Sequence, residues 1–188
     1  MRLLVPFTIL VWVLFEATLF LRDAVRGKGS TVNDRGTRSF LVIMAFVAFV
    51  AGTGLAFWLR NDSIWQLGPG HRAVGLGLMW LGLALRVWAV VVLGSSFRTT
   101  VEVDATQTVI DSGPYRWIRH PAYTGVLLIA LGYGVTLGNW LSLIILLVIP
   151  AAGVLRRITV EEHALAAVMG QPYVTYQQHT KKLVPGLY

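Results

Sequence analysis

The chain of 188 residues contains no cysteine and little charge. The absence of cysteine excludes disulfides, thiolate metal sites, a cysteine nucleophile and lipid attachment at a C-terminal cysteine. Charged residues make up 13% of the chain and hydrophobic residues 55%, whereas about 25% charged residues would be expected in a soluble domain. The mean hydropathy is +0.65. This composition indicates an all-α integral membrane protein.

Long stretches with few or no charges predict five membrane-spanning helices, at about 3–21, 40–59, 73–93, 122–137 and 140–155. About 20 apolar residues are needed to cross a bilayer. The stretch 122–155 contains no Asp, Glu, Lys or Arg and is too long for one helix, so the break at 138–140 predicts a helical hairpin. The first span is interpreted as a helix rather than a cleaved signal peptide, because Glu16 interrupts it and no cleavage pattern follows. We expect a single membrane domain over residues 1–188.

Lysine and arginine are distributed unevenly between these spans. Twelve of them fall on one side of the membrane, and only Arg2, Arg60 and Arg72 fall on the other. Because cytoplasmic loops carry the excess of positive charge, the N-terminus is predicted outside and the C-terminus in the cytoplasm. The membrane would be the cell membrane of a bacterium or archaeon, or the endoplasmic reticulum of a eukaryote. Topology and anionic lipid headgroups also account for the net charge of +7 without nucleic acid as a partner.

Small residues and isolated charges inside the spans predict contacts between helices. Gly75, Gly77 and Gly82 lie near one another on the third span, which favours close helix packing over a nucleotide-binding loop. Glu16 and Arg86 are each alone in an apolar span. Either they pair across two helices, or the Arg86 side chain extends to the membrane surface.

Motifs for several common chemistries are missing. The chain has no Walker loop, no His-Glu-x-x-His pattern and no Gly-x-Ser-x-Gly elbow. The four histidines lack the spacing of metal ligands, so no metal site is predicted.

Two polar segments flank the predicted hairpin. The sequence GPYRWIRHPAYTG at 113–125 places arginines, a histidine, three aromatic rings and two prolines immediately before an apolar run. Such a cluster is costly at a membrane edge unless something polar binds there, so it predicts one wall of a site. After the fifth span, Arg156 opens a polar helix that is expected to end at about Gly170. Arg157 and Glu161 are four apart on one face of this helix.

The order and spacing of these motifs resemble the isoprenylcysteine carboxyl methyltransferase family. More widely, they are similar to the membrane methyltransferases that include the phospholipid N-methyltransferases. The shared pattern is GPYxxxRHPxYxG, a hairpin, RxxxEE, GxxY and PGLY, and it covers residues 100–188, which are therefore expected to form the catalytic region, a helical hairpin with an amphipathic tail helix. Within the N-terminal transmembrane helices, 1–99, the first two spans carry no resemblance beyond hydrophobicity.

The resemblance implies a pocket for S-adenosylmethionine on the cytoplasmic side and assigns residues to it. The implied cofactor-binding residues are Gln107, Thr108, Val109, Ile110, Tyr115, His120, Pro121, Ala122, Tyr123 and Glu161. Glu161 and Arg157 are the implied catalytic residues, with Glu161 holding the cofactor and Arg157 facing the acceptor. Gln107 departs from the family, which usually has histidine there; glutamine retains hydrogen bonding but cannot titrate.

The implied function is methyl transfer to a lipophilic acceptor, which is either a prenylated substrate or a small molecule taken from the bilayer. The carboxylate of isoprenylcysteine or an analogue needs no general base. An amine headgroup lipid would first lose a proton, for which Glu162 or Tyr176 would be the base. Two other classes stay open: a sterol-type membrane reductase that uses NADPH, and a non-enzymatic scaffold.

Several of these residues also have simpler interpretations. Pro121 would begin a helix, since proline suits the first turn. Arg116 and Arg119 would act as topology signals. Tyr173 and Tyr176 would pack the tail helix against the bundle.

Overall fold

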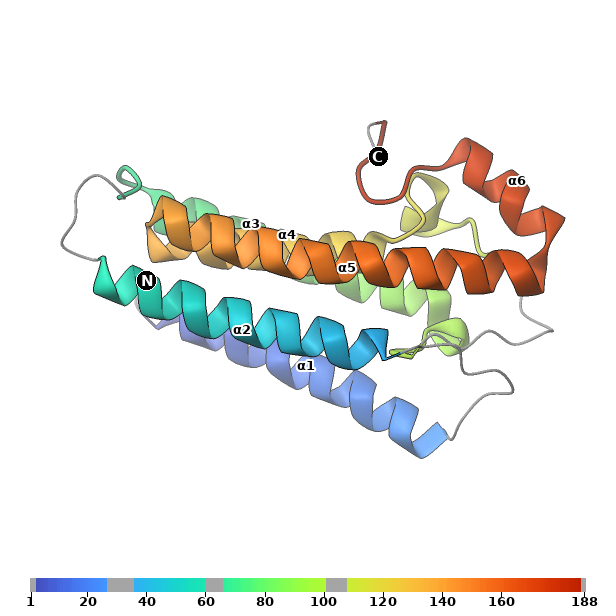
Figure 1. Ribbon diagram of the computed structural model, residues 1–188, viewed down its shortest axis with the longest axis horizontal. Coiled ribbons are helices and arrows are strands. Elements are labelled where there is room, and N and C mark those ends of the chain that lie inside the picture. The colour runs from blue at the N-terminus through green and yellow to red at the C-terminus, as the bar shows by residue number, and fades with distance from the viewer. Residues whose placement is uncertain (1–2, 27–35, 60–65, 101–107, 187–188) are drawn as a thin grey trace.

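The computed structural model describes residues 3–26, 36–59, 66–100 and 108–186, and Figure 1 shows how their helices are arranged. The long helices are α1 (Leu4–Arg26), α2 (Thr37–Trp58), α3 (His71–Leu93), α4 (Pro121–Leu137) and α5 (Trp140–Met169). Shorter elements are η2 (Gly94–Ser96), η3 (Gly113–Arg116) and α6 (Gln171–His179). Within the described ranges there are two isolated β-bridges and no strand, so the predicted all-α class is confirmed.

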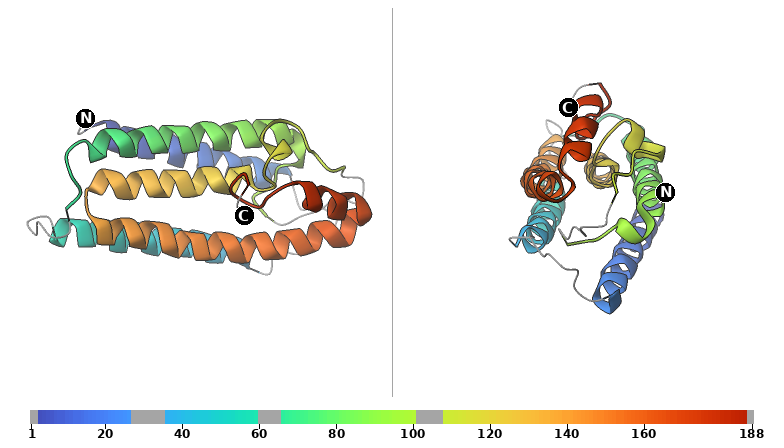
Figure 2. Two further views of the ribbon diagram at one scale, coloured as in Figure 1. Left: turned by 90° about the horizontal axis from the view of Figure 1, so that it is seen from above. Right: turned by 90° about the vertical axis from the view of Figure 1, so that its right-hand side faces the viewer.

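Four helices, α1, α2, α3 and α5, are long and apolar enough to cross a membrane. They coincide with four of the five predicted spans. The stretch predicted at 122–137 forms α4, which has 17 residues and is shorter than the other four. The left view of Figure 2 shows α4 enclosed between α3 and α5, and alternate helices run in opposite directions along the bundle (Figure 1).

Helices α3 and α4 touch through their backbones at two glycine pairs. A Cβ atom added to Gly82 would lie 2.6 Å from the carbonyl oxygen of Gly125, and one added to Gly75 would lie 2.5 Å from that of Gly132. Any side chain would force the two helices apart. The predicted packing role is confirmed for Gly75 and Gly82, but it is wrong for Gly77, whose added Cβ would meet nothing within 4 Å. Gly77 lies on the exposed side of the same helix.

The predicted hairpin between α4 and α5 is confirmed. Helix α4 ends at Gly138, which has φ 73°, a left-handed conformation that glycine adopts without strain. Asn139 then caps α5, because its side-chain oxygen accepts a hydrogen bond from the Ser142 backbone N–H at 3.0 Å.

The expectation that a separate polar helix opens at Arg156 is wrong, because α5 continues as one helix of 30 residues from Trp140 to Met169. From Arg156 onward the sequence is polar, so this part of the helix favours water over lipid. Arginine and glutamate are good helix formers, however, and they do not end the helix. A helix of this length is about 45 Å long, whereas the apolar core of a bilayer is about 30 Å thick. The polar turns therefore extend beyond the apolar half. As predicted, Gly170 ends the helix.

After α6 the chain returns to the start of α4. The backbone N–H groups of Arg119 and His120 donate to the carbonyl oxygens of Lys181 and Lys182 at 2.8 and 3.0 Å. The Thr124 hydroxyl donates to the carbonyl oxygen of Leu183 at 2.8 Å. This tail segment, 181–183, therefore holds the end of the polar cluster 113–125 in place by hydrogen bonds. The segment 108–110 is irregular, and the preceding residues 101–107 lie outside the described residues.

Candidate active site

A cavity of about 320 Å³ opens at the end of the bundle where α1 and α3 end and α2 and α4 begin. Its volume is at the lower end of the range of about 300–1,000 Å³ that is typical of ligand pockets. Most of its wall is apolar. Nine of the residues implied by the resemblance line it: Thr108, Val109, Ile110, Tyr115, His120, Ala122, Tyr123, Arg157 and Glu161. The structure thus brings together two segments that the α4–α5 hairpin separates in the sequence.

One implied residue is not part of this wall, and another lies outside the described part of the chain. Pro121 is fully buried as the first residue of α4 and does not line the cavity, in agreement with its simpler interpretation as a helix start. Gln107 lies outside the residues that the structure describes.

The hydroxyl of Tyr123 connects the two segments. It donates a hydrogen bond to Oε2 of Glu161 at 2.7 Å and accepts one from Nε of Arg157 at 2.6 Å. Tyr123 lies in the first turn of α4, and the four-residue spacing on α5 places both partners on the side that faces it. Arg157 is 3% exposed and also donates to the Thr37 hydroxyl at 3.2 Å and the Thr99 carbonyl oxygen at 2.6 Å. Its guanidinium is therefore fixed by α2, α4 and the segment after α3.

The neighbouring glutamate faces a different environment. Oε1 of Glu162 accepts from Nε of Arg119 at 2.8 Å and lies 3.2 Å from Nε2 of His120. Its other oxygen is 3.5 Å from Nζ of Lys182. Glu162 is buried in this cluster and does not line the cavity, so it is poorly placed to act as the general base suggested for an amine acceptor.

The interpretation of Arg119 as a topology signal alone is wrong. Its side chain is only 8% exposed and lines the cavity. Besides Glu162, it donates to the carbonyl oxygens of Gln177 and Thr180. Arg119 therefore ties the cavity wall to the chain that follows α6.

Tyr115, Tyr173 and Tyr176 provide three of the aromatic rings of the wall. Tyr173 and Tyr176 line the cavity as well as packing α6, so the expectation that they only pack the tail helix is incomplete. The Tyr176 hydroxyl donates to the Tyr115 carbonyl oxygen at 2.7 Å. Burial raises the pKa of Tyr115 and Tyr173, and it raises the pKa of Tyr176 to about 12. All three phenols are neutral near pH 7, which makes Tyr176 a poor general base.

The isolated charges Glu16 and Arg86 form the predicted pair between helices. Nη2 of Arg86 donates to Oε2 of Glu16 at 2.7 Å, and Nε donates to the other carboxylate oxygen. Nη1 of Arg86 donates to the carbonyl oxygen of Ala122 at 3.1 Å. The alternative, in which Arg86 extends to the membrane surface, is wrong. Both charged groups line the cavity.

Comparison with known proteins identifies the family. The model of the isoprenylcysteine carboxyl methyltransferase (ICMT) family matches residues 74–167, from the first turn of α3 to the polar turns of α5. The chain belongs to the ICMT family. The matched region includes Tyr115, His120, Tyr123, Arg157 and Glu161.

Similar proteins bear names from the ICMT family. Protein-S-isoprenylcysteine O-methyltransferase B of Arabidopsis thaliana is 30% identical over 149 residues, which are 78% of this chain and 70% of that protein. The protein-S-isoprenylcysteine O-methyltransferase of Schizosaccharomyces pombe is 32% identical over 119 residues, which are 62% of this chain and 49% of that protein.

A solved structure has a similar fold over the matched part. The structure of a eukaryotic intramembrane Ras methyltransferase of the ICMT family matches with a TM-score of 0.59 and 27% identity, over 79% of this chain and 52% of that one. The chain thus spans about half the length of the solved ICMT. With its long apolar helices, this ICMT family member is a multi-pass integral membrane protein.

Part of the cavity wall was not predicted from the sequence. Trp12, Glu16 and Phe20 come from α1, Arg38 from the start of α2, and Arg98 from the segment after α3. Of these, only Glu16 gave a signal, because a carboxylate is rare in an apolar span. The others look like ordinary aromatic residues of a membrane helix or ordinary cations of a membrane-surface loop.

Proposed function

We propose that this member of the ICMT family transfers a methyl group from S-adenosylmethionine to the carboxylate of an isoprenylated cysteine or a small lipophilic analogue. The observation that carries the proposal is the connection of Tyr123, Arg157 and Glu161 through one hydroxyl at the wall of an apolar cavity. The family match supports methyl transfer over the NADPH-dependent reductase and the scaffold.

The wall residues fit the chemical groups of the proposed donor. S-adenosylmethionine combines a sulfonium, an ammonium, a carboxylate and an adenine. Tyr115, Tyr173 and Tyr176 offer aromatic faces for the sulfonium or the adenine. Glu161 offers a carboxylate to the ammonium, and His120 offers a ring nitrogen to the carboxylate or the ribose.

The charge of the cavity supports a carboxylate acceptor over an amine. Five arginines line the described wall, Arg38, Arg86, Arg98, Arg119 and Arg157, against the two carboxylates of Glu16 and Glu161. S-adenosylmethionine carries one net positive charge and does not reduce this excess. An anionic acceptor does reduce it, whereas an ammonium would add a further positive charge to a wall of low polarity.

The protein's part in the reaction is positioning and exclusion of water. When bound, the donor supplies an electrophilic methyl group on a positively charged sulfur. An acceptor carboxylate has a pKa of about 3.5 and is ionised at neutral pH, so no residue has to remove a proton. Arg157 is proposed to orient this carboxylate while Tyr123 keeps Arg157 and Glu161 in register. The apolar wall excludes the water that would stabilise the separated opposite charges.

The arrangement in the membrane is part of the proposal. Twelve of the 16 lysines and arginines follow the first, third and fifth apolar stretches in the sequence, which favours the cytoplasmic side for the end of the bundle that holds the cavity. The N-terminus would be outside and the C-terminus cytoplasmic, with α4 as the fifth span. Residues 100–188 would form the catalytic region, completed by residues of α1 and α2. The membrane would be the cell membrane in a prokaryote or the endoplasmic reticulum in a eukaryote.

Methyl transfer by the purified full chain tests the proposal. Labelled S-adenosylmethionine should yield an alkali-labile methyl ester on an S-farnesylcysteine analogue, and no stable label in the amine lipids of a total lipid extract. Label in the amine lipids, with none on the farnesylcysteine analogue, would reject the carboxylate acceptor.

Two variants test the proposed division of roles. Glu161→Ala should weaken S-adenosylhomocysteine binding, measured by calorimetry, by at least about tenfold, because it removes the partner of the ammonium. Arg157→Ala should leave this affinity within about twofold and lower turnover by about 100-fold, because it removes the group that orients the acceptor.

Arg156→Ala is the matched control, since the Arg156 guanidinium is 4.5 Å from the Phe40 ring, outside the cavity. Unchanged cofactor affinity in Glu161→Ala would remove Glu161 from the donor site. Equal loss of donor affinity and turnover in Arg157→Ala would contradict the separate roles.

A further inference from the structure

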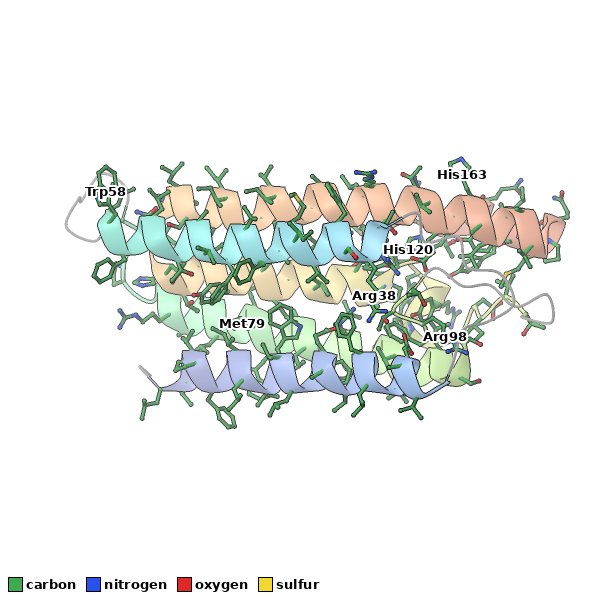
Figure 3. All side chains as sticks on the ribbon, turned by 60° about the horizontal axis from the view of Figure 1, so that its bottom comes forward. Arg38, Trp58, Met79, Arg98, His120 and His163 are labelled. Atoms are coloured by element: carbon green, nitrogen blue, oxygen red, sulfur yellow. The ribbon has the colours of Figure 1, made fainter. Side chains whose placement is uncertain are left out.

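Among the five arginines of the cavity wall, Arg98 differs from the rest. Arg86 is paired with Glu16 and Arg119 with Glu162, while Arg157 is bound to Tyr123 and the guanidinium of Arg38 lies 4.3 Å from the ring centroid of Phe20. Arg98 lines the same cavity and is half-buried, but it makes no hydrogen bond, ion pair or ring contact with any residue that the structure describes. Figure 3 shows it at the same end of the bundle as Arg38 and His120.

The backbone on both sides of Arg98 is nevertheless held firmly. Before it, the carbonyl oxygen of Phe97 accepts a hydrogen bond from Nη2 of Arg22 at 2.8 Å. After it, the backbone N–H of Thr99 donates to the carboxylate of Asp23, and the Thr99 carbonyl oxygen accepts from Arg157 at 2.6 Å. Helices α1 and α5 therefore fix the segment 97–99 from two directions. The Arg98 guanidinium therefore has a defined position on the wall and no partner among the described residues.

A half-buried cation on a mostly apolar wall is costly unless an anion completes its hydrogen bonds. The planar guanidinium offers pairs of parallel N–H donors, which match the two oxygens of a carboxylate. We propose that Arg98 binds the carboxylate of a ligand in the cavity, either that of the acceptor or that of the donor. The inference rests on the proposed function, because both the donor and the proposed acceptor carry such a group. The partners of the other arginines leave Arg98 as the cation with open donors.

The test compares three variants of the full chain in lipid nanodiscs. Arg98→Gln removes the charge, and Arg98→Lys keeps the charge but loses the paired donors. Arg116→Gln removes an exposed cation of the same end of the bundle that does not line the cavity. Two quantities are measured: the KM for an S-farnesylcysteine analogue, and the Kd of S-adenosylhomocysteine by calorimetry.

Arg98→Gln is expected to raise one of these two constants by about tenfold or more, as loss of a charge-assisted contact does. Arg98→Lys should lie between Arg98→Gln and the wild type, and Arg116→Gln should match the wild type. A higher KM, with unchanged inhibition by the farnesylcysteine methyl ester, assigns Arg98 to the acceptor carboxylate. A higher Kd alone assigns it to the carboxylate of the donor.

Unchanged KM and Kd in Arg98→Gln would overturn the inference, and so would an equal effect of Arg116→Gln, which would indicate surface charge alone. Failure of the proposed function gives a different result, because the wild type itself would then form no ester. The Kd measurement would still test Arg98 in that case.

Discussion

Helices α4 and α1 both contact α3, but they do so by different means. Helix α4 touches it backbone to backbone at the pairs Gly75–Gly132 and Gly82–Gly125. Helix α1 contacts it through side chains, which include the apolar Phe15 and Leu19 and the ion pair between Glu16 and Arg86. Only 11% of the apolar stretch of α1 is buried inside the protein, against 39% of that of α3.

The consequence is a cavity with two kinds of wall. Helices α3 and α4 form a fixed wall, and α1 forms a loose wall. Figures 1 and 2 show α1 diverging from α2 toward the end of the bundle where the cavity lies. Close glycine contacts leave α3 and α4 no freedom to separate. Single polar contacts allow a helix to shift when one of them breaks. We therefore expect α1 to be the side of the cavity that shifts when the proposed lipophilic acceptor binds.

The largest effect is expected from enlarging a glycine of the fixed wall. Gly82→Leu should abolish the folded protein, because its Cβ alone would lie 2.6 Å from the Gly125 carbonyl oxygen. The measurement is the yield of monodisperse protein in size-exclusion chromatography. Gly77→Leu is the matched control on the same helix, since its added Cβ would meet nothing within 4 Å. A folded Gly82→Leu protein would show that α4 is not fixed by these contacts.

A smaller effect is expected at the ion pair of the loose wall. Glu16→Gln leaves Arg86 without its carboxylate inside the apolar bundle and should lower the free energy of unfolding by about 3 kcal/mol. Unfolding in mixed micelles measures this change. The double variant with Arg86→Gln should recover part of the loss, because no unpaired charge remains. If Glu16→Gln were as stable as the wild type, the pair would not hold α1.

The smallest effect is expected where α1 faces α2. Phe20→Leu removes the ring that lies 4.3 Å from the Arg38 guanidinium and should cost less than about 1 kcal/mol of unfolding free energy. The same micelle assay measures it. Phe7→Leu, at a position on α1 that is 53% exposed, controls for loss of an aromatic ring alone. A loss as large as that of Glu16→Gln would make this contact, rather than the ion pair, the main attachment of α1.

The sequence predicted the residues of α3 and α5 that shape the cavity better than it predicted those of α1. Gly82 in an apolar helix already indicates a close contact, and the spacing of Arg157 and Glu161 already places them on one face. Helix α1 has no comparable pattern, and apart from Glu16 its residues resemble those of any membrane helix. A sequence that is apolar all round does not say which side faces a cavity.

The burial of Arg119 was also outside the reach of the sequence. Arg119 looks like a loop cation, but it is buried because Glu162 and the carbonyl oxygen of Thr180 come to it through the tertiary fold. The continuation of α5 past Arg156 was missed for a related reason. A change from apolar to polar residues marks where a helix leaves the membrane, and it does not mark where the helix ends.

The pairing of the tail segment 181–183 with the start of α4 bears on how the protein is made. Thr124 and Leu183, whose groups bond in the folded state, are 59 positions apart in the chain. The start of α4 is therefore synthesised before the residues that hold it in place. The cavity wall therefore stays unfinished until translation has passed Leu183, and the enzyme can only begin to work after that point.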